Sequence, residues 1–91
     1  MSLDLQERSV TRDGKQFLDR LGLQGKTEKI ENYTYGNLYR KLVISKNDIE
    51  HEVYYSIVAN GNSLLFKGKW MDQTELAEIE NIVLSLETKV R

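Results

Sequence analysis

Residues 51–70 read HEVYYSIVANGNSLLFKGKW, and this stretch decides the fold. Two runs rich in β-branched and aromatic residues, which favour strands, flank the dipeptide Asn60-Gly61. That dipeptide is the strongest short-range signal for a type I′ hairpin turn, because both residues tolerate a positive φ. A two-residue turn at this point sets Ile57 opposite Leu64, so that apolar side chains share one face of the hairpin. The stretch therefore predicts an antiparallel hairpin with one buried face.

The same alternation extends upstream through two further runs, which are separated by turns containing glycine or asparagine. A turn at Lys46-Asn47 keeps the apolar residues of neighbouring strands on one face, which we call the core face. On the opposite face, which we call the outer face, this turn sets Tyr39 opposite Tyr54, and on the core face it sets Leu42 opposite His51. The sequence therefore predicts a four-stranded antiparallel meander, with strands at residues 28–34, 38–45, 49–59 and 63–70.

Helices are predicted before and after the meander, at residues 13–21 and 73–89. Each begins at a capping box, an aspartate followed three residues later by Gln16 or Glu75. The first helix carries apolar residues on one side, and the sequence leaves open which face of the sheet it covers. Residues 1–9 are predicted to be a poorly ordered lead-in. The second helix has an apolar stripe that we expect to cover the core face, formed by Leu76, Ile79, Ile82, Val83, Leu86 and Val90.

These elements predict a single two-layer α+β domain over residues 1–91, with the C-terminal helix packed on one face of the sheet. The chain has no cysteine, and its first ten residues lack the apolar run of a signal peptide, so we expect a cytoplasmic protein. The apolar stretch 82–84 is far too short to span a bilayer, so no membrane partner is expected. The net charge of −1 argues against a nucleic-acid binder defined by bulk charge.

Motifs for catalysis, cofactors and metals fail when their spacing is tested. Residues 22–27 read GLQGKT and end like a phosphate-binding P-loop, but Arg20 stands where that motif needs its first glycine. The segment also follows a predicted helix and precedes a strand, the reverse of the order that the motif requires. His51 is the only histidine, and in a strand Glu50 and Glu52 point away from it, so the three cannot share a metal. We expect no enzyme activity, no catalytic residue, no metal and no cofactor.

Two polar residues on the core face, Arg40 and His51, mark an alternative site, an anion-binding groove between the sheet and the second helix. We expect Arg40 to meet an acidic residue on the helix flank, Glu80 or Glu87, with Asn32 opposite it on the neighbouring strand. Arg40 therefore has two interpretations, a structural side chain at the edge of the core or a ligand for an anion. His51 is expected to be a packed, hydrogen-bonded histidine.

The outer face combines aromatic, lysine and apolar side chains, and it is the predicted binding surface. Three explanations fit it: contact with another protein, cover by the first helix, or stacking of single-stranded nucleic-acid bases beside lysines that meet phosphates. We expect a non-catalytic interaction domain that forms a homodimer through this face, with a single-stranded nucleic-acid-binding module as the alternative. The predicted binding residues are Tyr39, Lys41, Tyr54, Leu65, Lys67 and Lys69.

Overall fold

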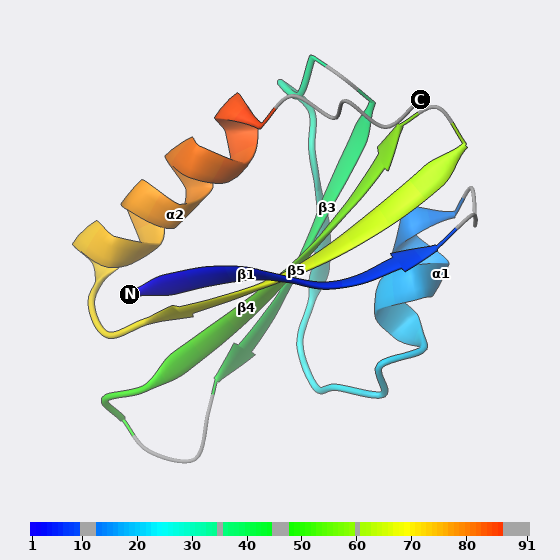
Figure 1. The fold of residues 1–91 in the computed structure, drawn as a ribbon. Helices are drawn as coiled ribbons and strands as arrows, with labels where there is room; N and C mark the ends of the chain where they lie inside the picture. Colours follow the sequence, from blue (N-terminus) through cyan, green and yellow to red (C-terminus); the bar gives the residue numbers. More distant parts are fainter. Residues whose placement is uncertain (10–12, 35, 45–47, 60, 87–91) are drawn as a thin grey trace.

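The structure is a computed structural model that describes residues 1–9, 13–34, 36–44, 48–59 and 61–86. Its centre is a five-stranded antiparallel sheet in the order β1-β5-β4-β3-β2 (Figure 1). Within the described residues, no helix has the length and apolar character needed to cross a bilayer. The elements are β1 (Ser2–Ser9), α1 (Gly14–Asp19), β2 (Thr27–Ile30), β3 (Asn37–Ile44), β4 (His51–Ala59), β5 (Asn62–Trp70) and α2 (Gln73–Ser85).

The β4–β5 hairpin has the predicted register. Ile57 lies opposite Leu64, and the pairing continues to His51 opposite Trp70 at the far end. Side chains alternate between the two faces with a period of two residues, so this register puts the apolar residues of both strands together. The side chain of Ile57 is fully buried, which confirms that the core face was correctly identified.

The register between β3 and β4 differs from the prediction by two residues. Tyr39 lies opposite Ser56 rather than Tyr54, and Leu42 lies opposite Val53 rather than His51. The predicted turn at residues 46–47 lies outside the described residues. Six residues, 45–50, separate the end of β3 from the start of β4, so the connection is longer than a tight two-residue turn. A shift of two residues keeps each side chain on its predicted face, because the side-chain period is two.

Residues 1–9 were predicted to be a poorly ordered lead-in, and this prediction was wrong. Residues 2–9 form β1, an edge strand that places Leu3 opposite Gly68 and Leu5 opposite Phe66. Pairing satisfies the backbone groups on the free edge of β5, and the two leucines extend the core face by one strand. The α+β class and the antiparallel sheet are confirmed, but the sheet has five strands instead of four.

The helices lie on opposite faces of the sheet, so the fold has three layers and not the predicted two (Figure 1). Ile79 and Val83 of α2 are fully buried on the core face, whereas Phe17 and Leu18 of α1 pack on the outer face. Both predicted aspartate caps are present. The Asp13 and Asp72 carboxylates each accept a hydrogen bond of 3.0 Å from the backbone N–H three residues later.

Both helices are shorter than the sequence predicted. α1 ends at Asp19, and α2 ends at Ser85 because Leu86 takes an extended conformation with φ −66° and ψ 124°. The predicted last residues of the second helix, 87–89, lie outside the described residues, as does Val90 of its stripe. The carbonyl of Leu86 instead accepts a hydrogen bond of 3.1 Å from the Tyr33 hydroxyl. This bond fixes the end of α2 near the end of β2.

Candidate functional site

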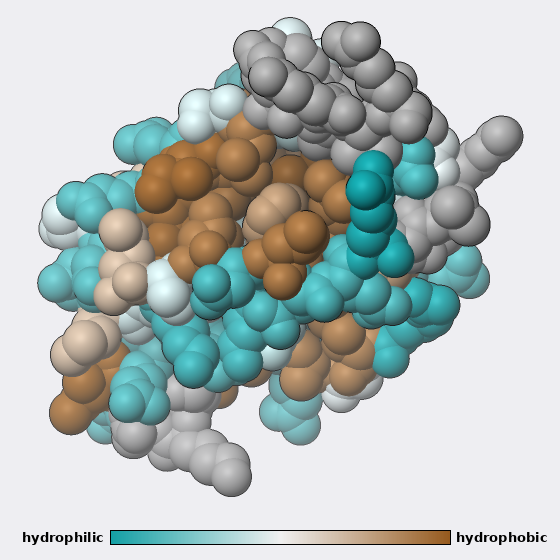
Figure 2. All heavy atoms as spheres, in the orientation of Figure 1, coloured by the Kyte–Doolittle hydropathy of each residue, from teal (hydrophilic) through white to brown (hydrophobic). Residues whose placement is uncertain are grey.

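The helices leave an apolar strip open on the core face of the sheet. The side chain of Leu5 is 54% exposed and that of Ile82 is 42% exposed, and Leu3, Leu64 and Phe66 are partly exposed on the same face. Figure 2 shows this surface as a patch between α2 and β1, bordered by polar residues. We define the apolar strip as Leu3, Leu5, Leu64, Phe66 and Ile82.

The position of α2 explains why this strip is uncovered. A Cβ atom at Gly68 would lie 3.2 Å from Ile79 Cγ2 and 3.1 Å from Val53 Cγ1, so the helix sits tightly over β5 and β4 at this point. From there α2 runs away from β1 toward Tyr33, whose hydroxyl meets the end of the helix (Figure 1). The helix and β1 therefore diverge, and the core-face side chains between them meet solvent.

Acidic residues of α2 border one side of the strip. Glu75 lies on the flank that faces β1, because its carboxylate is 3.1 Å from the Met1 amino group. Glu75 also accepts a hydrogen bond of 2.8 Å from the Met71 backbone N–H, and this bond is the largest cause of its lowered pKa. Ile82 follows Glu75 by nearly two helical turns and shares its flank, and exposed Glu78 lies between them. At the other end of β1, Arg8 pairs with Leu64 and is exposed on the core face.

On the outer face, α1 covers part of the predicted binding surface. Leu65 is only 3% exposed beneath Phe17 and Leu18, while Tyr39 and Tyr54 pack partly buried around the same cluster. Of the three explanations that the sequence allowed, cover by the first helix accounts for Leu65. A binding role for the outer face stays a prediction.

The lysines of the outer face differ in their surroundings. Lys41 is buried and its Nζ lies 3.9 Å from Asp19, although it was predicted as part of an open surface. The Nζ of Lys67 lies 3.4 Å from a Glu52 carboxylate oxygen and 5.9 Å from the ring centre of Tyr54. Burial lowers the pKa of Lys67, but the neighbouring Tyr54 and Glu52 outweigh it and raise the pKa overall. Lys69 remains exposed opposite Glu52.

Arg40, one half of the predicted anion groove, is held between two carboxylates. Its guanidinium donates to Glu80 on α2, as the sequence predicted, and to Glu28 on β2. Glu28, and not Asn32, is the residue opposite Arg40, because β2 ends at Ile30. Two carboxylates around one guanidinium leave little positive potential for a further anion.

The structure does not bring Arg40 and His51 together. Arg40 pairs with Tyr55, whereas His51 pairs with Ile44, four positions further along β3. Four residues of a strand span roughly 13 Å, too far for both side chains to meet one small anion. Burial of the Tyr55 hydroxyl, which lies near the ion-paired Glu80 and Arg40, raises its pKa.

The ion pair between Glu28 and Arg40 should make stability depend on pH. The hydrogen bond from Arg40 is the largest cause that holds the pKa of Glu28 below its ordinary value of 4.5. A lowered pKa in the folded state stabilises the fold above the ordinary value, and this stabilisation is lost as the pH falls through the folded-state pKa. We therefore expect the free energy of unfolding of Glu28→Gln to fall less than that of the wild type when the pH is lowered from about 6 to about 3. Urea titrations at each pH measure this free energy. Glu31→Gln, in the exposed turn after β2, should behave as the wild type does; equal behaviour of both variants would contradict the assignment.

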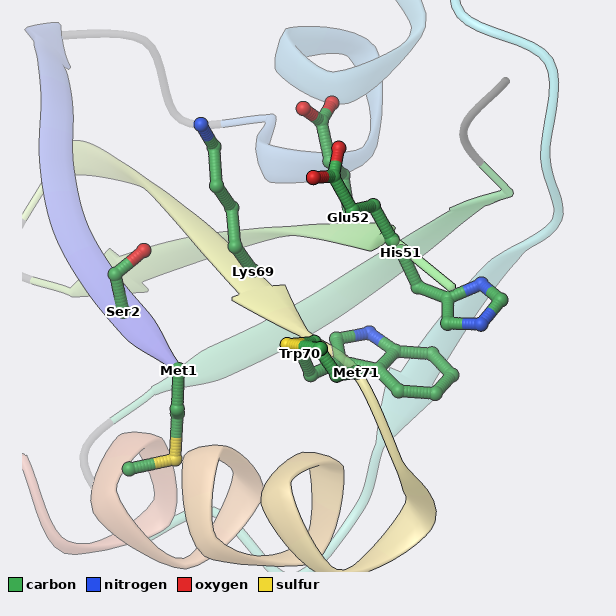
Figure 3. Close-up of a pocket in the computed structure, with 8 residues that line it drawn as sticks. Met1, Ser2, His51, Glu52, Lys69, Trp70 and Met71 are labelled. Carbon is green, nitrogen blue, oxygen red and sulfur yellow. The ribbon is translucent and has the colours of Figure 1, made fainter. Parts of the chain in front are cut away.

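His51 and Trp70 stack at the end of the sheet, beside a pocket of about 250 Å³. Their ring centres lie 4.3 Å apart with planes at 26°, and within the described residues neither His51 Nδ1 nor Trp70 Nε1 has a hydrogen-bond partner. Figure 3 shows the stacked rings on one side of the strands and the side chains of Lys69 and Glu52 on the other. The polar groups that line this pocket therefore come from both faces of the sheet. The described residues also contain no cluster of three potential metal ligands.

Sequence reasoning missed the apolar strip. Leu64, Phe66 and Ile82 were assigned to the core face or the apolar helix stripe, and residues 1–9 were not assigned to the sheet. The alternation of Leu3 and Leu5 with polar neighbours was the available signal for β1, but two apolar residues are a weak pattern.

Comparison with known proteins identifies no relative of this chain. No protein-family model matches the chain, and searches of curated proteins and of solved structures find no match either.

Proposed function

We propose that the chain is a non-catalytic interaction domain that binds an apolar partner surface through the apolar strip. The observation that carries this proposal is the exposure of Leu5 and Ile82 on either side of partly exposed Leu64 and Phe66. Contiguous apolar patches bordered by polar residues mark interaction sites on soluble domains more often than scattered apolar residues do. Fully burying a leucine or isoleucine side chain contributes roughly 1.5–3 kcal/mol, so covering half-exposed Leu5 and Ile82 contributes about 1 kcal/mol each.

This proposal moves the binding surface from the outer face to the core face. On the outer face, α1 already covers Leu65, and the Lys41 and Lys67 ammonium groups lie near carboxylates. On the core face, the strip has no such cover within the described residues. The non-catalytic part of the proposal is supported by His51, the only histidine, whose imidazole packs against the Trp70 indole.

The test is binding of a fluorescently labelled amphipathic peptide of leucine and lysine, measured by anisotropy. We expect saturable binding by the wild type and a loss of at least about tenfold in affinity for Leu5→Glu, since a carboxylate cannot be buried unpaired in an apolar contact. Ile44→Glu is the matched control, because Ile44 is 75% exposed and lies on β3, three strands away from β1 in the sheet. It should bind as the wild type does.

Two results would contradict the proposal. The first is no peptide binding by the wild type, and the second is equal loss in Leu5→Glu and Ile44→Glu. A labelled oligonucleotide serves as a further probe. Binding that weakens steeply with salt and is lost in Lys69→Glu would favour the nucleic-acid alternative instead.

A further inference from the structure

We draw no further inference here: the strongest candidate, the apolar strip on the core face between β1 and α2, belongs to the site already described, and nothing in the structure shows what covers it.

Discussion

Ile79→Ala is expected to lower the free energy of unfolding by about 2–5 kcal/mol, because it leaves a cavity at the most closely packed contact between α2 and the sheet. Ile79 is fully buried, and its side chain lies directly over Gly68 and Val53. The space there cannot close easily, since the glycine has no side chain to move into it. Urea denaturation of the variant and the wild type measures the difference.

Ile82→Ala is the matched control for this substitution. Ile82 lies three residues later in the same helix, but its side chain is 42% exposed in the apolar strip. We expect it to lower the free energy of unfolding by less than about 1 kcal/mol, because the side chain removed is already partly exposed in the folded state. Equal effects of the two substitutions would mean that the buried face of α2 has been wrongly assigned.

Gly25→Ala is the second substitution with a large expected effect, about 3 kcal/mol or more. Gly25 has a φ of +154°, and a Cβ added to it would lie 1.8 Å from the carbonyl oxygen of Leu42. Either the loop or β3 must move, which endangers the 3.5 Å hydrogen bond between the Leu42 N–H and the Lys26 carbonyl next to β2. Thermal unfolding followed by circular dichroism measures the loss.

Gly22→Ala separates backbone strain from the steric clash. Gly22 also has a positive φ, +66°, but a Cβ there would have no atom within 4 Å. Only the left-handed conformation is then penalised, by about 1–2 kcal/mol. If both alanine variants lose equal stability, the close approach to Leu42 is not what the glycine provides. The glycines of GLQGKT thus have a structural explanation, as the failed comparison with the P-loop pattern already indicated.

The parts of the fold that the sequence predicted are those set by neighbouring residues. The Asn60-Gly61 dipeptide and the alternation around it determine the β4–β5 register, and the two aspartate caps determine where the helices begin. β1 was missed because its partner strand lies some sixty residues away, and no local pattern reports such a pairing. The β3–β4 register was wrong because it depends on loop length, which the side-chain alternation does not fix.

The face covered by α1 was left open because the outer face is apolar enough to accept a helix. Gly14 lets α1 pack on the outer face. A Cβ at this position would lie 2.5 Å from Val58 Cγ2, so only a glycine allows the first residue of the helix to approach β4 this closely. A glycine at the start of an apolar helix was an available signal for such close packing. The apolar strip was harder to find, because its exposure depends on where α2 crosses the sheet and not on which residues form it.

Because β1 is an edge strand, the apolar strip is complete only while β1 stays paired with the rest of the sheet. β1 has one neighbour, β5, so it can separate from the sheet without breaking the pairing of any other strands. Elements at such positions open with less free energy than the core, and their amide hydrogens exchange earlier. Leu3 and Leu5 leave with the strand, so only the closed population presents the complete strip, and the apparent affinity for any partner scales with that closed fraction. Substitutions that hold β1 closed would therefore tighten binding without altering a single contact at the interface.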